Sequence, residues 1–107
     1  QPLQKPYWRV EMRVFVVYDI TENKRRRRVV RLCGDYGLIR AQKSVFVGIV
    51  EDARAAGFVA ALEKELDVAQ DSLFILPTDK RRIREGRYMG KGFDMALAMR
   101  EAHVVFV

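Results

Sequence analysis

The sequence predicts a single mixed domain in which strands alternate with helices in the order β-α-β-α-β, with a weaker fourth strand near the C-terminus. The most apolar run, residues 12–19, is rich in β-branched and aromatic residues, as buried strands are. Two stretches, residues 22–36 and 51–68, place their apolar residues at helical spacing. A short apolar run follows over residues 72–76. A chain of 107 residues has room for one core.

The run from Met12 to Asp19 is expected to be the central strand of the sheet. Apart from Arg13 at its start, neither of its two faces is polar. Such a strand is expected to be buried on both faces. The carboxylate of Asp19 then emerges at the end of the strand, where open sheets usually carry their chemistry. Asp19 is therefore the first candidate for a functional residue.

The first helix is predicted from about Glu22 to Tyr36, with Thr21 as its N-cap and Gly37 as its C-terminal stop. At 100° per residue its apolar side chains cluster on one side of the helix. That side carries Val29, Val30, Leu32, Cys33 and Tyr36.

The arginines of this helix are divided between two directions. Arg26 lies near the centre of the apolar arc, so it should point inward, towards the strand end that carries Asp19. A run of arginines is usually only a solvated face, and that alternative stays open for Arg27. The outward side carries Lys24, Arg27, Arg28 and Arg31.

Residues 38–50 form a second long strand pattern, whose alternation separates two faces. The face expected to be core under the helices carries Ile39, Ala41, Val45, Val47 and Ile49. The opposite face mixes polar groups with one aromatic residue, which indicates an interface or the wall of a site. It carries Arg40, Gln42, Ser44, Phe46 and Val50.

The two ends of the chain have weaker patterns. Residues 1–11 contain two prolines and are expected to be an upstream extension or a cloning remnant, so that the domain is residues 12–107. A fourth strand is predicted over residues 83–89 and a short helix over residues 93–102. Residues 103–107 form an apolar tail that needs a sheet edge to pair with, its own or a partner's.

The charge of the chain points to a polyanionic partner. Twenty Lys and Arg residues against 14 Asp and Glu give a net charge of +6, which favours nucleic acid or an anionic membrane surface. A merely solvated basic surface remains the alternative. No apolar run approaches the roughly 18 residues of a membrane span. Cys33 is the only cysteine, so we expect a soluble, cytoplasmic protein with a reduced, buried thiol.

Few motifs for catalysis are present. With one cysteine and one histidine, the chain has no metal-ligand cluster of those residues, and His103 has no catalytic partner. The glycines near the C-terminus do not form a phosphate loop between a strand and a helix. One acid, Asp19, remains beside several arginines. A single carboxylate is a poor site for a divalent cation, and a symmetric dimer would supply two.

Four segments carry a resemblance to a known family. They are YDI at residues 18–20, the run of arginines at the start of the first helix, YGL at residues 36–38 and RAQKSVF at residues 40–46. Together they resemble the small CRISPR-associated proteins of the spacer-acquisition machinery (the Cas-two family). The resemblance covers residues 12–77 without a gap.

This resemblance implies an α+β, ferredoxin-like βαββαβ fold with an antiparallel sheet, which fits the predicted elements if residues 83–89 form the remaining strand. It implies a homodimer packed sheet to sheet, with a C-terminal strand added to the partner's sheet. It also implies a Mg²⁺-dependent endonuclease of RNA or DNA that partners the CRISPR integrase. The alternative is a non-catalytic adaptor that binds double-stranded DNA in the integration complex.

The resemblance also assigns roles to residues. Asp19 matches the metal-binding aspartate of the family and is the predicted ligand of Mg²⁺. The predicted catalytic set is Asp19, Tyr18, Arg26, Ser44 and Phe46. Arg28 and Arg40 also match family positions, and with the outward Arg27 and Arg31 of the helix they make up the predicted nucleic-acid-binding set.

Overall fold

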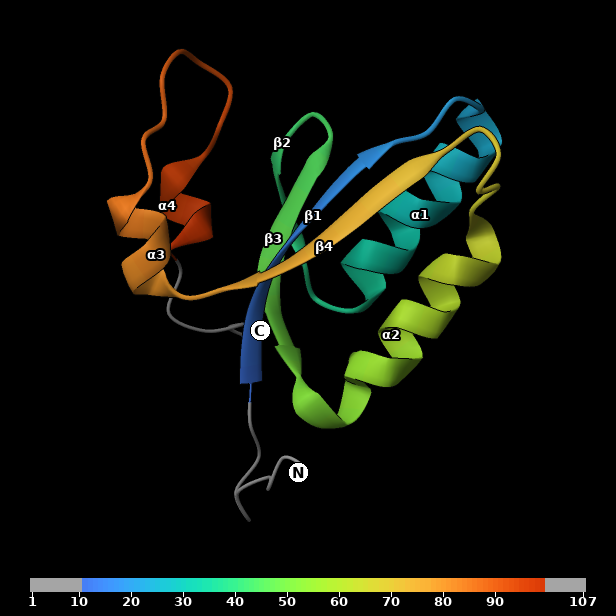
Figure 1. The fold of residues 1–107 in the computed structure, drawn as a ribbon, viewed down its shortest axis with the longest axis horizontal. Helices are drawn as coiled ribbons and strands as arrows, with labels where there is room; N and C mark the ends of the chain where they lie inside the picture. Colours follow the sequence, from blue (N-terminus) through green and yellow to red (C-terminus); the bar gives the residue numbers. More distant parts are fainter. Residues whose placement is uncertain (1–10, 100–107) are drawn as a thin grey trace, which may run out of the picture.

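One four-stranded antiparallel sheet, in the order β2-β3-β1-β4, forms the middle of the molecule (Figure 1). The computed structural model describes residues 11–99. Its elements are β1 (Glu11–Asp19), α1 (Asn23–Asp35), β2 (Ile39–Gln42), β3 (Val45–Glu51), α2 (Asp52–Glu65), β4 (Ser72–Thr78), α3 (Lys80–Glu85) and α4 (Met95–Ala98). The order β1-α1-β2-β3-α2-β4, with β1 central, confirms the ferredoxin-like α+β fold.

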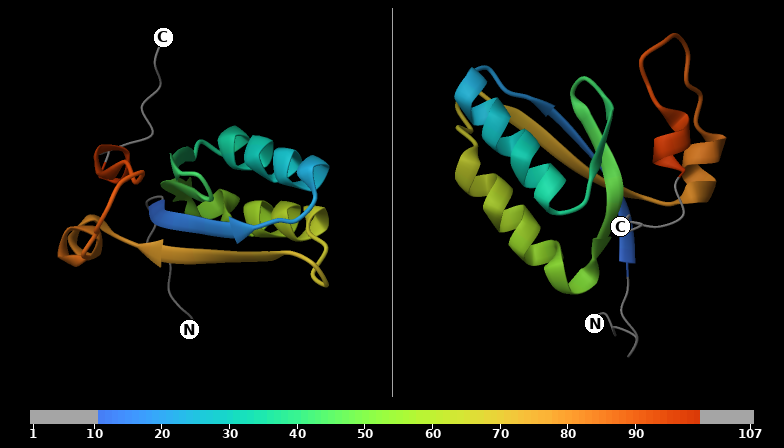
Figure 2. Two further views of the ribbon diagram at one scale, coloured as in Figure 1. Left: turned by 90° about the horizontal axis from the view of Figure 1, so that it is seen from above. Right: turned by 180° about the vertical axis from the view of Figure 1, so that it is seen from behind.

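The helices are distributed unequally over the two faces of the sheet. α1 and α2 lie side by side on one face, as Figure 2 shows from above and from behind. On the other face, α3 and α4 cover only part of the sheet, where Ile83 and Ala98 pack against Ala41 and Val47 and where Phe15 of β1 joins the same cluster. Within residues 11–99, none of the helices combines the length and apolar composition needed to cross a bilayer.

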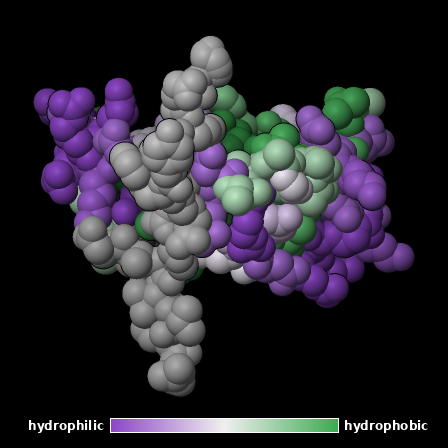
Figure 3. Space-filling model, turned by 90° about the horizontal axis from the view of Figure 1, so that it is seen from below, coloured by the Kyte–Doolittle hydropathy of each residue, from purple (hydrophilic) through white to green (hydrophobic). Residues whose placement is uncertain are grey.

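The opposite face of β1 and β4 is only partly covered, which corrects the prediction that β1 is buried on both faces. Val17 is 41% exposed, and its neighbours on β4, Phe74 and Leu76, are 59% and 42% exposed. We call these three residues, with Asp19 and Ser72 beside them, the open face. In Figure 3 apolar residues gather towards the upper edge, on the side of this face, between hydrophilic ends.

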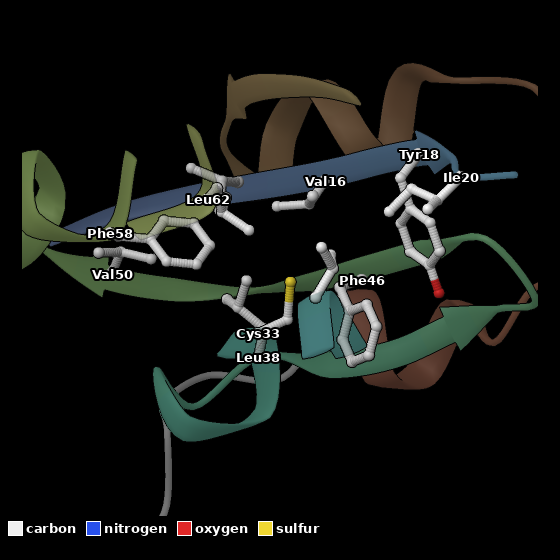
Figure 4. Packing of buried hydrophobic residues seen from close by; sticks show 11 residues of the cluster. Val16, Tyr18, Ile20, Cys33, Leu38, Phe46, Val50, Phe58 and Leu62 are labelled. Carbon is white, nitrogen blue, oxygen red and sulfur yellow. The ribbon is translucent and has the colours of Figure 1, made fainter. Parts of the chain in front are cut away.

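The main core lies between the sheet and the helices α1 and α2 (Figure 4). Val14, Val16 and Tyr18 of β1 are at most 3% exposed, because the pleat of the strand turns alternate residues towards the helices. Cys33 packs among them as predicted, fully buried, and burial raises the pKa of its thiol to about 12. A thiol with such a pKa remains protonated and unreactive at neutral pH.

Residues 38–50 are two strands and not one. A turn at Lys43 and Ser44 separates β2 from β3, which pair antiparallel as a hairpin. The predicted orientation of the two faces was also wrong. Phe46 and Val50 lie in the core under α1 and α2, while Val47 lies on the other face beneath α3 and α4.

The predicted strand over residues 83–89 was also wrong, because part of it belongs to α3. The side chain of Asp79 caps this helix by accepting a hydrogen bond from the Arg82 N–H at 2.8 Å. The fourth strand is β4, which continues through Pro77 because it lies at the sheet edge, where a missing N–H is tolerated. The tail predicted as a strand, residues 103–107, lies outside the described residues, as do residues 1–10.

Only the N-terminal end of α1 differs from the prediction. Glu22, and not Thr21, is the N-cap, and its carboxylate accepts from the Arg25 N–H at 3.2 Å. Gly37 ends the helix as predicted, with a φ of 89° that glycine adopts readily.

A buried ion pair ties α1 to the start of β4. The Asp71 carboxylate, whose side chain is 0% exposed, accepts from Nε of Arg25 at 2.7 Å and from Nη2 at 3.2 Å. It also accepts the backbone N–H groups of Thr21 and Asp67. The Arg25 hydrogen bond, followed by these backbone bonds, holds the pKa of Asp71 well below its usual range. The contact positions the start of α1, and with it the arginines that follow.

This ion pair predicts acid sensitivity. Because the pKa of Asp71 is lower in the folded chain than in the unfolded one, the pair stabilises the fold above the ordinary aspartate pKa of about 3.9. That stabilisation is lost as the pH falls through the depressed pKa. Asp71→Asn should lower the melting temperature at about pH 7, and its deficit against wild type should narrow below about pH 3.

The matched control is Asp35→Asn at the exposed end of α1. Thermal melts over the same pH range should show no comparable deficit for this variant. If Asp71→Asn melted at the same temperature as wild type at neutral pH, the assignment would be contradicted.

Candidate functional site

A groove of about 750 Å³ opens where β1 ends, between α1 and the turn of the β2–β3 hairpin. It brings together most of the residues that the sequence predicted. Its lining includes Tyr18, Asp19, Arg26, Arg27, Arg31, Arg40 and Ser44. Phe46 and Arg28 are the predicted site residues that do not line it.

Asp19 lies at the rim of this groove with its side chain exposed. Among the described residues it has no hydrogen-bond or ion-pair partner, unlike Asp71 and Asp79. In the sheet it stands opposite Ser72, on the same side of β1 as Val17. Asp19 therefore belongs both to the groove and to the open face.

Tyr18 lines the groove, and Phe46 supports it from the core. The Tyr18 hydroxyl donates to the Lys43 carbonyl at 3.2 Å, and the Tyr18 N–H donates to the Ser44 carbonyl at 3.1 Å. The Tyr18 ring stacks on Phe46 at 6.1 Å between centroids, and both side chains point into the core in Figure 4. These contacts attach the hairpin turn to β1. Both residues are 5% exposed or less, which suits support better than contact with a substrate.

Arg26 points inward as the sequence predicted. Its Nη1 donates to the Ile20 carbonyl at 2.7 Å, and its Nη2 donates to the Asn23 side chain. Arg40 approaches from the hairpin with its guanidinium 5.6 Å from the centre of the Phe46 ring, within the range of a cation–π contact. Two arginines of the groove, Arg26 and Arg40, are thus held in position by contacts within the protein.

The outward arginines of α1 differ from one another. Arg27 and Arg31 are exposed, line the groove and form no ion pair with the described residues. Arg28 turns towards α2, where its Nε donates to Glu65 at 2.7 Å. The structure therefore brings Arg27 and Arg31 to the groove and leaves Arg28 outside it.

The comparisons with known proteins agree with this fold. The family model described as CRISPR associated protein Cas2 matches residues 12–85. The chain belongs to this Cas2 family. The resemblance that the sequence motifs indicated is thereby confirmed, and the match extends eight residues beyond the predicted limit at residue 77.

Relatives in the family have informative names. "CRISPR-associated endoribonuclease Cas2 2" of Pyrobaculum aerophilum is 39% identical over 67% of this chain and 79% of its own length. A "CRISPR-associated endonuclease Cas1/endonuclease Cas2 fusion" of Thermoproteus tenax is 38% identical over 69% of this chain. The chain spans only 28% of that fusion protein.

Solved structures of the family share the fold. The crystal structure of Streptococcus pyogenes Cas2 at pH 6.5 superposes with a TM-score of 0.64 and 33% identity. The match covers 74% of this chain and 100% of that one. A hypothetical protein of Thermus thermophilus, TT1823, has the same TM-score with 28% identity, over 78% of this chain and 95% of that one.

The metal ligands that one Cas2 chain can offer are few. Within residues 11–99 no three His, Cys, Asp or Glu side chains form a cluster that could hold an ion. The Asp19 carboxylate is a hard oxygen ligand with no competing partner, which fits Mg²⁺ as one of the one or two carboxylates that such sites use. Among the described residues that line the groove, Asp19 is the only carboxylate, and a second copy of the chain could supply another.

Besides the apolar Ile20 and Val30, sequence reasoning missed one charged residue of the groove, Lys43. It was assigned to the middle of a strand, whereas it occupies the exposed hairpin turn and lines the groove. The polar pair Lys43-Ser44 between two apolar runs was the available turn signal.

The support role of Tyr18 can be tested by removing its hydroxyl. Tyr18→Phe keeps the ring against Phe46 and loses the bond to Lys43, which should cost roughly 0.5 to 1.5 kcal/mol of unfolding free energy. Tyr36→Phe is the matched control, because the Tyr36 hydroxyl has no recorded hydrogen bond in the described chain. Urea denaturation measures the difference. Unchanged stability with complete loss of nucleic-acid cleavage would instead make the hydroxyl part of the chemistry.

Proposed function

We propose that this Cas2-family chain is a metal-dependent endonuclease of RNA or DNA that acts as a homodimer in CRISPR spacer acquisition. The observation that carries the proposal is the position of Asp19. An exposed carboxylate without a partner lies where an arginine-lined groove meets the open face. The endoribonuclease names of the relatives from Pyrobaculum aerophilum and Korarchaeum cryptofilum support the activity.

The charge of the groove suits a phosphate backbone. Five cationic side chains line it against one carboxylate: Arg26, Arg27, Arg31, Arg40 and Lys43. Contacts of this kind position a strand without reading its bases, so binding should tolerate many sequences and weaken as salt rises. Arg27 and Arg31, which form no ion pair with the residues that the structure describes, would supply the mobile phosphate contacts.

Asp19 would hold the cation, Mg²⁺ or another divalent ion. When bound, a cation of this type polarises a phosphoryl oxygen and makes a water more acidic. The chain's own residues then orient the substrate. Ser44 would offer its hydroxyl to a phosphate oxygen. Arg26 is held in place by its hydrogen bonds to Ile20 and Asn23, so its side chain would lose little conformational entropy when the substrate binds.

The open face supports the proposed homodimer. Val17, Phe74 and Leu76 expose a contiguous apolar surface of the kind that marks association sites. Packing of two open faces would bring the two Asp19 carboxylates towards each other, because Asp19 lies on that side of β1. The site would then have the two acids that one chain lacks.

The proposal includes a protein partner and a location. The Thermoproteus tenax relative joins Cas1 and Cas2 in one chain, which supports Cas1 as a partner here and agrees with the expected partnership with the CRISPR integrase. We place the protein in the cytoplasm, where a reduced thiol such as Cys33 is expected.

The second candidate function is a non-catalytic adaptor that binds double-stranded DNA for the integrase. The same groove favours it, because phosphate binding by Arg27 and Arg31 needs no carboxylate and no metal. The two candidates differ only in what Asp19 does.

Asp19→Asn separates the two functions. The substitution keeps the shape of the side chain and removes its charge, so Mg²⁺-dependent cleavage should be lost while binding is kept or slightly strengthened. Cleavage of labelled RNA and DNA with Mg²⁺ and with a chelator, beside anisotropy titrations without metal, measures both properties.

Asp35→Asn is the matched control, because it removes one exposed carboxylate from α1 away from the groove. This variant should cleave like wild type. Binding by every variant without cleavage by wild type would reject the nuclease and favour the adaptor. Absence of binding would reject both.

Phe74→Ser tests the dimer. Each copy should lose about 1.5 kcal/mol of apolar burial, so dissociation of a symmetric dimer should become easier by roughly 3 kcal/mol, or about 150-fold in Kd. Val68→Ser, which changes a residue 87% exposed in the α2–β4 loop, is the control. Sedimentation equilibrium at micromolar concentration provides the measurement. A monomeric wild type would refute the proposed dimer.

A further inference from the structure

Residues 87–92, within the segment that joins α3 to α4, form a loop anchored to the sheet. The Tyr88 hydroxyl accepts a hydrogen bond from the Phe93 N–H at 3.0 Å. The Tyr88 ring packs on Phe93 at 5.4 Å between centroids, and Phe93 packs on Phe15 of β1 at 6.0 Å. The loop therefore has a defined shape, although it lies beyond the residues that match the Cas2 family model.

This loop lies beside the hairpin whose turn borders the groove. The Asp94 N–H donates to the Ala41 carbonyl of β2 at 2.8 Å, which brings the end of the loop against the strand that leads to the turn. Figures 1 and 2 show the loop rising on one side of the hairpin, with α1 on the other side. The hairpin turn, with Lys43, thus separates the groove from the loop.

The loop is cationic. Residues 87–92 contain Arg87 and Lys91 and no acid, and both side chains are exposed. Neither is recorded in an ion pair with the described residues. Lys91 stands between Gly90 and Gly92, whose φ angles of 103° and 98° permit the turn that presents it to solvent.

The acids near the loop are few and do not cancel its charge. Glu85 and Asp94 flank it, but α3 adds the exposed cations Arg81 and Arg84. Asp79, at the start of α3, is already paired with Arg82 at 2.6 Å. The groove and the loop thus each present cationic side chains, on the two sides of the hairpin whose turn carries Lys43.

We propose that residues 87–92 are a second phosphate-binding surface for the nucleic acid that occupies the groove. This inference rests on the proposed function and extends it to the substrate. The nucleic acid would cross the hairpin turn, contacting Arg27 and Arg31 on one side and Lys91 and Arg87 on the other. Such contacts reach only the backbone, so the loop adds affinity and footprint without sequence preference.

The test compares three double variants in one salt titration. The loop variant is Arg87→Gln with Lys91→Gln, and the groove variant is Arg27→Gln with Arg31→Gln. The control, Arg54→Gln with Lys64→Gln, removes the same two charges from α2. The probe is a duplex of about 30 base pairs, which at roughly 3.4 Å per base pair exceeds the 40 Å length of the molecule. Thermal melts check that each variant is folded.

Loss of two phosphate contacts should make the log–log salt dependence of affinity less steep by about 1.8 for the loop variant, while the control keeps the wild-type slope. If the loop variant had the same salt dependence as the control, the inference would be overturned, and a contact with a protein would become the alternative role of the loop. The proposed function then still stands if the groove variant binds weakly. If neither variant weakens binding, the nucleic-acid function itself fails.

Discussion

The two-residue period of β1 determines where the functional groups of this protein lie. Val14, Val16 and Tyr18 must face α1 and α2, because their burial forms the centre of the core. Asp19 is then obliged to face the other side, beside Val17. The alternation of β1 thus buries Tyr18, which supports the site, and exposes Asp19, which can perform chemistry. A shift of one residue would exchange these roles and bury a carboxylate in the core.

The run of four arginines shows how a helix distributes identical residues among different surroundings. Successive side chains differ by about 100° in direction, so no two neighbours in the run face the same way. Arg25 pairs with Asp71, Arg26 bonds the Ile20 carbonyl, and Arg28 pairs with Glu65. Arg27 lines the groove without an ion pair in the described chain. Three of the four therefore fasten the helix to its neighbours, and the fourth remains available to a ligand.

Much of the fold was predictable because its elements have strong periodicity. β1, α1 with its inward Arg26, and the buried Cys33 follow from apolar spacing alone. The β2–β3 turn was missed because Lys43-Ser44 lacks the glycine or asparagine that marks tight hairpins, so one alternation appeared to continue. α3 was missed because it buries a single apolar residue, Ile83, although Asp79 was available as a capping signal.

The candidate site was predictable only in part, for a related reason. The groove joins residues from β1, α1 and the hairpin, and motif resemblance identified most of them. It did not distinguish the exposed residues of the site from the buried ones, Tyr18 and Phe46. Tyr18 and Phe46 are adjacent in space to exposed groups, yet the direction of each side chain depends on which face the helices cover. The alternation of residues separated the two faces of the hairpin, but it did not specify which of them α1 and α2 cover.

The open face links assembly to chemistry. Its apolar residues favour association, whereas Asp19 at its end opposes it, since like charges brought close repel one another. A cation held between two such carboxylates would remove the repulsion and bind the dimer in preference to the monomer. Any ligand with that preference stabilises the dimer by mass action. Under the proposed function, metal binding and dimer formation are therefore a single coupled equilibrium. Each copy contributes one carboxylate, Asp19, so the site is complete only when the apolar surfaces of two copies are also buried.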